Sequence, residues 1–225
     1  MLVTLHVWRV PRRRFGHALV RMAGEPRRLR ALPGVRFAKV LGTGAGKTFG
    51  PTDADPTRFA ALVVWHDRPD VESVERRWNA IASTRARLEL IPLTSRGRWS
   101  GGTPFGHPHG GRTDGMVLAM TRARLRARKA LTFWRAVPPV VAELDAAPGL
   151  LARFGMGEAP IGWQGTVTVW RSTAELTGFA YRQPQHRAVI ARTPADRWYA
   201  EDLFARFAVR EIEGDRHVLG WREER

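Results

Sequence analysis

The 225-residue chain contains no cysteine. It therefore forms no disulfide, holds no iron–sulfur cluster on thiolates of its own, and offers neither a thiol nucleophile nor a thiolate ligand for a metal. Lysine is almost as scarce, because Lys39, Lys47 and Lys129 are the three lysines and all other basic residues among the 37 are arginine.

Acidic residues are also few, and the imbalance gives a formal net charge of +16 and a pI near 11.6. Such a balance is typical of nucleic-acid-binding proteins, because arginine and lysine neutralise phosphates. Here, however, the arginines are spread along the chain with Asp and Glu between them, and an arginine-rich codon bias gives the same totals. We therefore expect no specific nucleic-acid partner.

Long apolar runs are missing as well. No stretch approaches the roughly 20 apolar residues that cross a bilayer, and we expect no transmembrane segment. The opening "MLVTLHVWRVPRRR" has its apolar residues before its charges, so it predicts a first strand and not a signal peptide. With 44% hydrophobic residues the chain can bury a substantial core, and we expect a cytoplasmic protein.

What the chain does contain is an internal repeat. Each copy has an amphipathic helix ending at Pro-Gly, a strand ending at Gly-x-Gly, a strand ending in Trp, a second helix and a last strand. An opening strand precedes each copy, "LVTLHVWRV" in the first and "GMVLAMTRARLR" in the second. The matched residues are Pro33-Gly34 with Pro148-Gly149, Gly42 and Gly44 with Gly155 and Gly157, and Trp65 with Trp170.

The order β-α-β-β-α-β, written twice, predicts an α+β fold: a duplicated ferredoxin-like plait whose sheets pack face to face. The space between a sheet and its helices is a natural ligand cavity. We expect an N-terminal half at residues 1–99, a Gly- and Pro-rich linker at 100–115, a C-terminal half at 116–213 and a tail at 214–225.

The copies differ between the strand-ending Trp and an Arg-Trp pair that we expect in each second helix, Arg77-Trp78 and Arg197-Trp198. The second copy has extra residues there, "GFAYRQPQHRAVIART", which include His186. An insertion in one copy of a duplicated fold is where function often resides. We therefore single out His186 as a candidate ligand or catalytic residue.

The stretch "LGTGAGKTFG" imitates a phosphate-binding P-loop. That motif needs a glycine five residues before Gly46, where Leu41 stands, and a helix from the Lys, where Pro51 follows too early. The second copy, "FGMGEAP", keeps Gly-x-Gly without Lys-Thr. We expect instead a strand end at which bare backbone passes close to another backbone or to a flat ligand.

Arginines alternate along the second opening strand, which predicts one basic, solvated face. These residues are Arg122, Arg124, Arg126 and Arg128.

Several blocks resemble the spheroidene monooxygenase family of carotenoid biosynthesis. They are "KVLGTGAGKTFGP", "RGRWSGGTPF", "TRARLRARKALTFWRAVPPV", "FGMGEAP", "VTVWRS" and "QHRAVIARTPADRWYAEDLFARFAV", in order along nearly the whole chain. The resemblance implies a dimeric α+β barrel fold and a haem-dependent monooxygenase that uses O2 and external electrons on a hydrophobic substrate. It also implies haem b as cofactor and His186 as the proximal iron ligand.

The same resemblance directs the remaining site expectations. Arginines are expected at the haem propionates, aromatic side chains at its walls and glycine strand ends against its flat face, and one acid and one arginine are candidates for distal catalysis. The cofactor-binding candidates are Arg96, Arg98, Trp99, Phe133, Trp134, Gly155, Gly157, His186 and Trp198, and the catalytic candidates are Arg96 and Glu158.

An external ferredoxin or reductase is the expected electron donor, since an acidic partner suits a basic surface. A homodimer, and peripheral membrane attachment for a lipophilic substrate, are further expectations. Three alternatives stay open: haem chemistry without O2 insertion, such as peroxide-dependent oxidation or aldoxime dehydration; a non-catalytic haem- or nucleic-acid-binding module; and cofactor-free oxygenation.

Overall fold

Eight antiparallel strands form a closed barrel in the order β1-β3-β2-β6-β7-β5-β8-β4. The computed structural model describes residues 1–47, 51–108, 110–111, 113–158, 163–182 and 197–222. The strands are β1 Leu2–Arg9, β2 Val35–Gly44, β3 Ala54–Trp65, β4 Thr84–Gly97, β5 Val117–Leu125, β6 Leu150–Gly157, β7 Trp163–Trp170 and β8 Tyr199–Gly214. The helices are α1 Phe15–Arg30, α2 Val71–Asn79, α3 Ala130–Asp145 and α4 Thr173–Arg182, with short 3-10 turns at Arg12–Arg14, Pro51–Asp53, Ala127–Lys129 and Arg216–Leu219.

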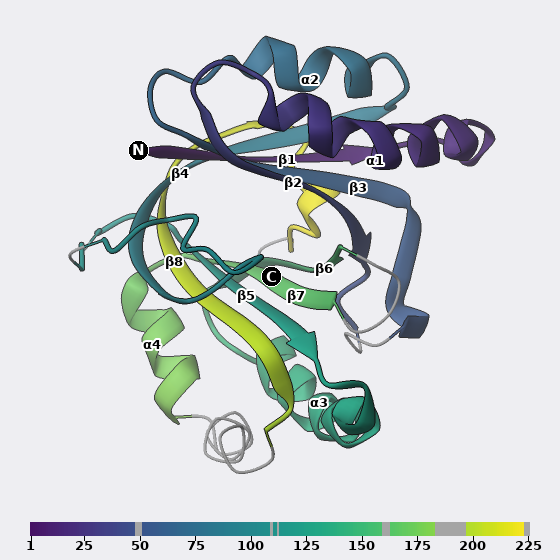
Figure 1. Cartoon of the computed structure of the whole chain (residues 1–225). Helices are drawn as coiled ribbons and strands as arrows, with labels where there is room; N and C mark the ends of the chain where they lie inside the picture. Colours follow the sequence, from purple (N-terminus) through teal and green to yellow (C-terminus); the bar gives the residue numbers. More distant parts are fainter. Residues whose placement is uncertain (48–50, 109, 112, 159–162, 183–196, 223–225) are drawn as a thin grey trace.

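Each half supplies one four-stranded sheet, β4-β1-β3-β2 and β6-β7-β5-β8, and the two sheets join along β2–β6 and β4–β8. The predicted α+β fold with two β-α-β-β-α-β halves is therefore confirmed. In Figure 1, α1 and α2 cover one side of the barrel and α3 and α4 the opposite side. Apolar residues from all eight strands fill the interior, among them Leu5, Leu88, Phe154 and Phe207.

The two Gly-x-Gly motifs meet where β2 joins β6. Gly42 pairs with Gly157 and Gly44 with Gly155. A Cβ on Gly42 would lie 3.9 Å from Gly157 O, which is ordinary contact, whereas a Cβ on Gly44 would lie 3.0 Å from Asp53 O. The close backbone approach is therefore at Gly44, and it lies within the N-terminal half.

In the stretch that resembles a P-loop, backbone amides bind a carboxylate of the same chain. The backbone amides of Gly46 and Lys47 donate hydrogen bonds to the Asp53 carboxylate at 2.9 to 3.1 Å. Backbone amides of this kind bind the phosphate in a phosphate-binding loop. Here they already donate to the Asp53 carboxylate, so the segment has a structural role.

One sequence alignment was wrong. Trp78 lies in α2, but Trp198 directly precedes β8 and Arg197 has a positive φ of 48°. The helix that corresponds to α2 is α4, which contains the first part of the extra segment. The remainder, residues 183–196 with His186, lies outside the described residues. No helix of the described chain is both long and apolar enough to span a bilayer.

Aromatic residues fill the layer between the N-terminal sheet and its helices. Trp8 stacks on Trp78 with ring centroids 5.1 Å apart, and His6 stacks on Trp8 at 5.5 Å. Phe59 and Trp65 complete this core, in which Trp8, Trp65 and Trp78 are fully buried. Such large buried rings leave little free volume.

His6 is held inside this layer by two side chains. Its Nδ1 lies 3.0 Å from Glu75 Oε1 and its Nε2 lies 3.0 Å from Thr4 Oγ1. Thr4 Oγ1 also accepts a hydrogen bond from Trp65 Nε1. We therefore assign the Thr4 hydroxyl as the donor to His6 Nε2. The imidazole proton then lies on Nδ1, which donates to Glu75. Burial lowers the pKa of His6, against the opposing hydrogen bond and charge of Glu75.

This lowered pKa predicts a pH dependence of stability. Below about pH 6.5 the unfolded chain protonates this histidine while the folded chain does not, so the unfolded state binds more protons and stability falls as pH falls. One such group contributes at most about 1.4 kcal/mol per pH unit. We expect the His6→Gln variant to be less stable than wild type near pH 7.5. Between pH 7 and 5 it should lack the part of the fall in stability that His6 causes in wild type. Urea unfolding at each pH measures both effects.

The exposed His17 on α1 provides the control, because His17→Gln should keep the wild-type pH slope. Parallel slopes for wild type and His6→Gln would contradict the assignment of a neutral His6.

Candidate functional site

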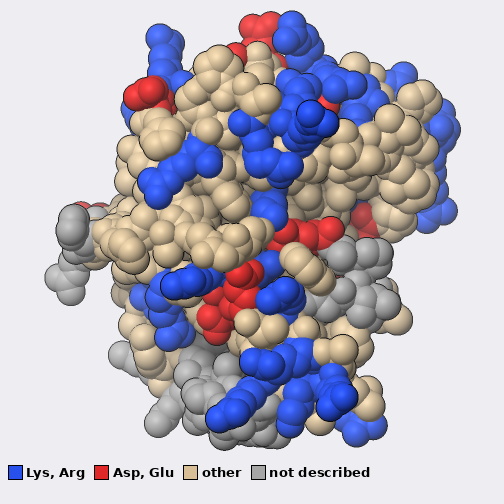
Figure 2. All heavy atoms as spheres, viewed as in Figure 1, with Lys and Arg blue, Asp and Glu red and all other residues tan. Residues whose placement is uncertain are grey.

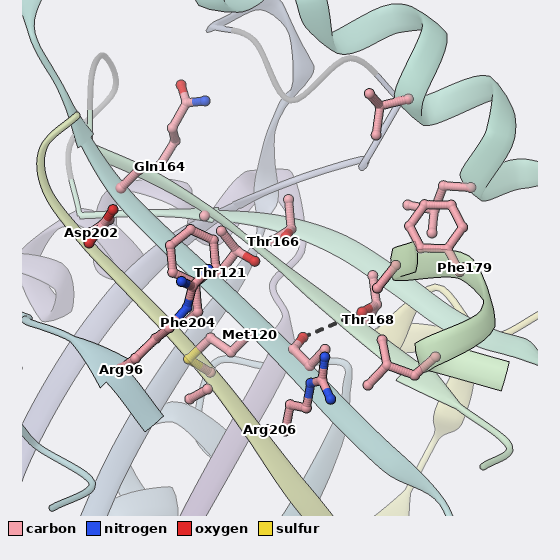
Figure 3. A pocket seen from close by; sticks show the side chains of 18 of the residues that line it. Arg96, Met120, Thr121, Gln164, Thr166, Thr168, Phe179, Asp202, Phe204 and Arg206 are labelled. Atoms are coloured by element: carbon pink, nitrogen blue, oxygen red, sulfur yellow. Dashed lines mark hydrogen bonds between the residues drawn. The ribbon is translucent and has the colours of Figure 1, made fainter. Parts of the chain in front are cut away.

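A cavity of ≈ 910 Å³ lies between the C-terminal sheet and its helices. The volume is within the range of about 300 to 1,000 Å³ typical of small-molecule sites. Its apolar wall comes from α3 and α4, and its floor from β4, β5, β7 and β8 (Figure 3). The helix residues that line it are Phe133, Ala136, Val137, Val140, Val141, Leu144, Leu176, Phe179, Ala180 and Tyr181.

Comparison of the two halves explains why this space is open. Trp65 pairs with Leu2, and Trp170 pairs with Val117, so the two opening strands align residue by residue. Counting along these strands matches Trp8 with Ala123, His6 with Thr121 and Phe59 with Gln164. The C-terminal half thus has alanine, threonine and glutamine where the N-terminal layer has two large aromatic rings and an imidazole. The cavity occupies the place that aromatic packing fills in the other half.

The cavity floor is polar in a regular way. Thr121, Gln164, Thr166 and Thr168 lie on the helix-facing side of β5 and β7. Trp134 on α3 donates from Nε1 to Gln164 Oε1 at 3.0 Å, which fixes this amide. The hydroxyl of Thr168 accepts from Trp170 Nε1 at 2.9 Å. Hydroxyl and amide groups of the floor therefore face the apolar wall formed by α3 and α4, as in sites that orient a mainly hydrophobic ligand.

Charged side chains line the cavity at its edge with β4 and β8. Asp202, Phe204 and Arg206 alternate along the helix-facing side of β8, and Figure 3 shows Phe204 between the other two. The guanidinium of Arg96 stacks over the Phe204 ring at 4.4 Å. Two cations and one carboxylate thus line the described part of the cavity.

A second cluster of charges lies on the opposite, interior side of the sheet. Glu158 accepts hydrogen bonds from Trp99 Nε1 at 2.8 Å and from Arg122 Nη2 at 2.8 Å, and it pairs with Lys39. Arg122 also pairs with Glu201. The side chain of Arg122 is 3% exposed, so the prediction of a solvated face fails at this residue.

Glu201 is ionised in this cluster. Burial alone would raise its pKa, but hydrogen bonds from the Gly101 amide and from Arg122 outweigh burial and set the pKa below its usual value. The Arg122 guanidinium lies 5.7 Å from the Trp99 ring and 5.5 Å from the Trp163 ring. The cluster satisfies its members mutually, which is the pattern of a structural ion-pair network.

The structure divides the predicted site residues between these two places. Arg96 and Phe133 line the cavity, Trp134 bonds to the lining Gln164, and the buried Trp198 packs edge-to-face on Phe133 at 5.6 Å. These four residues come together although they derive from β4, α3 and the chain before β8.

The other predicted residues lie elsewhere. Trp99 and Glu158 belong to the interior cluster, where Glu158 is engaged by three side chains. Gly155 and Gly157 pair with β2 and are not among the residues that line the large cavity. Arg98 is exposed and donates its backbone amide to Asp202 O at 2.6 Å. His186 lies outside the described residues.

Sequence reasoning missed Arg206, Thr121 and Ala123. The alternation of Asp202, Phe204 and Arg206 shows that they share one face of a strand, but period-two spacing does not reveal which face meets the helices. Aligning the opening strands by their Trp partners would have revealed Ala123 as a site where bulk is lost.

The chain is similar to known proteins over most of its length. It is 31% identical over 193 residues to the spheroidene monooxygenase of Rhodobacter capsulatus, covering 81% of this chain and 78% of that one. It is 33% identical over 193 residues to that of Rubrivivax gelatinosus, covering 81% and 72%. The chain belongs to the spheroidene monooxygenase family. It is accordingly an oxidoreductase of the monooxygenase class. No protein-family model matches it.

Solved structures share the fold of this chain. An aldoxime dehydratase has a TM-score of 0.56 at 12% identity and covers 92% of this chain and 80% of its own. A second aldoxime dehydratase structure, co-crystallised with butyraldoxime, has a TM-score of 0.55 at 14% identity, with 92% and 79% coverage. At such identities the likeness concerns the barrel fold alone.

The contrast between the halves predicts the effect of refilling the cavity. Ala123→Trp restores the side chain found at the matching position of the N-terminal layer. We expect the variant to fold with an unfolding midpoint no lower than wild type, and to bind the neutral probe Nile red at least about tenfold more weakly, which corresponds to about 1.4 kcal/mol. Circular dichroism and fluorescence titration measure both.

Ala200→Trp is the matched control, since Ala200 is exposed on β8 and should leave binding unchanged. Equal Nile red affinity in Ala123→Trp and wild type would show that the probe binds elsewhere.

Proposed function

We propose that this member of the spheroidene monooxygenase family is a haem-dependent monooxygenase that oxygenates a hydrophobic small molecule with O2 and external electrons. The observation that carries the proposal is the cavity of ≈ 910 Å³ beneath α3 and α4. Tyr181, near the end of α4, and Tyr199, at the start of β8, both line it. The chain therefore leaves and re-enters the described structure at this cavity, and His186 belongs to the intervening residues.

The described lining fits a large flat cofactor with acidic side groups. It offers apolar walls on α3 and α4 and two guanidinium groups, Arg96 and Arg206. No histidine is among the lining residues described, and the described chain holds no group of three His, Asp or Glu that could bind a metal ion. A single axial histidine suffices for haem iron, and we assign that role to His186.

When bound, haem b would supply the activation of O2. The chain would contribute binding and orientation. Val137, Val140 and Phe179 would exclude water and pack on the substrate, and Gln164 and Thr166 would orient polar atoms. The relatives are named for spheroidene, and a carotenoid-type molecule suits such walls, so we propose a substrate of that class.

Electrons would come from a separate protein, because a chain without cysteine carries no iron–sulfur cluster on thiolates of its own. Figure 2 shows Lys and Arg scattered over the visible face, an acidic patch near its middle, and further Asp and Glu at its upper edge. An acidic ferredoxin or reductase would be attracted to such a surface. The expected homodimer stays a prediction, since the barrel is closed by strands of one chain.

The cofactor assignment predicts a spectrum. Protein purified with haem should show a Soret band that shifts on reduction with dithionite and again on addition of CO. His186→Ala should lose or shift this band, because the iron loses its axial imidazole. His217→Ala should not, since His217 is exposed in the turn Arg216–Leu219, outside the cavity lining.

A colourless wild-type preparation that still turns over substrate would exclude haem and favour cofactor-free oxygenation.

The reaction class predicts the co-substrates. Product should form with O2 and a reductase system, and one oxygen atom from ¹⁸O2 should appear in the product. A peroxidase would instead act with peroxide alone and without O2. Product formation under argon with peroxide, and no ¹⁸O incorporation from O2, would therefore reject monooxygenation while keeping the haem assignment.

A further inference from the structure

Arg206 is placed in the cavity by the alternation of β8. Its neighbours Ala205 and Phe207 point into the barrel interior, so Arg206 faces the helix layer. Across the sheet it pairs with Thr94 on β4 and with Ala119 on β5, both of which also line the cavity. Neither neighbour carries charge.

Among the described residues, Arg206 has no ion pair and makes no side-chain hydrogen bond. The carboxylate found in the described lining, Asp202, is four residues away on the same face of β8, which is roughly 13 Å at the strand rise of about 3.3 Å per residue. Figure 3 shows Asp202 and Arg206 on either side of Phe204.

Other arginines of the barrel strands show the usual arrangement. Arg58 donates to Thr43 Oγ1 at 2.9 Å and to the carbonyl oxygens of Gly44 and Val218. Arg122 pairs with Glu158 and Glu201, and Arg87 pairs with Glu213. Each of these three guanidinium groups has anionic or carbonyl oxygens as partners. The half-buried Arg206 has none among the described residues.

Water can satisfy Arg206 while the cavity is open. A ligand that fills the cavity displaces this water, and a guanidinium left without a partner carries a desolvation cost. A pure hydrocarbon would incur that cost in full. A carboxylate reaching Arg206 would remove it, because guanidinium and carboxylate form charge-assisted and often bidentate hydrogen bonds.

We propose that Arg206 is the anion-binding residue of this cavity, and that the ligand filling the cavity presents a carboxylate to it. The inference rests on the proposed function only in taking the cavity as the ligand site. The carboxylate has two sources, a haem propionate or a free organic acid with an apolar chain. Arg96 is the weaker candidate, since it is exposed and its guanidinium stacks on Phe204.

The test compares each acid with its ester. Apoprotein is titrated with haemin and with haemin dimethyl ester, followed by the Soret band, and with dansyl-aminoundecanoic acid and its methyl ester, followed by fluorescence. Wild type should bind the acid of at least one pair about 10 to 100 times more tightly than the ester, the range expected for one charge-assisted hydrogen bond. The pair that shows the preference identifies the source.

Arg206→Leu should abolish this preference, leaving acid and ester with equal affinities, and Arg206→Lys should retain part of it. Arg210→Leu is the matched control, because Arg210 is exposed on the same strand and does not line the cavity. It should keep the wild-type ratio. Because the ratio is taken within one variant, a general loss of stability does not imitate the effect.

An unchanged acid preference in Arg206→Leu, or its loss in Arg96→Leu instead, would overturn the proposal. So would a wild-type protein that binds each ester as tightly as its acid. The proposed function fails separately: wild type that binds neither haemin nor its ester, yet prefers the dansyl acid through Arg206, would reject haem and keep the anion site.

Discussion

The pairing of the two halves edge to edge is the constraint on which the rest of this structure depends. Joining β2 to β6 and β4 to β8 brings every sheet edge against a strand of the other half and closes the barrel. The shorter of these joins pairs Gly42 with Gly157 and Gly44 with Gly155. Once the barrel is closed, apolar side chains fill its interior. The cavity of ≈ 910 Å³ lies outside the barrel wall, beneath the helices.

The two halves have the same order of strands and helices, but different side chains occupy the layer between the sheet and its helices. In the N-terminal layer, stacked rings and the His6–Glu75 hydrogen bond occupy the volume between sheet and helices. In the C-terminal layer, Ala123 and Thr121 leave that volume open, and the threonine contributes a hydroxyl group to its lining. The charges follow the same division: Glu75 is surrounded by partners, whereas Arg206 faces the cavity. The cavity thus lies where the other half holds large packed side chains.

The sequence predicted the fold well because the repeat carries it. Matching Pro-Gly, Gly-x-Gly and Trp positions fix the order of elements, and each element has a periodicity of its own. The Arg-Trp match failed because a Trp is buried as readily before a strand, as at Trp198, as within a helix. Burial of Arg122 and openness around Ala123 escaped prediction for a shared physical reason. Both depend on which side chains meet across strands far apart in the chain.

Fusion of the two halves into one polypeptide has a consequence for how such a site can evolve. In a symmetric dimer of one plait, replacing a core Trp by Ala would hollow both subunits, and each such loss of a large aromatic side chain costs about 3 to 5 kcal/mol. Here Trp8 and Ala123 occupy matching positions and mutate independently. The N-terminal half can therefore keep its tightly packed core and its stability, while the C-terminal half has a binding cavity that lowers its own stability.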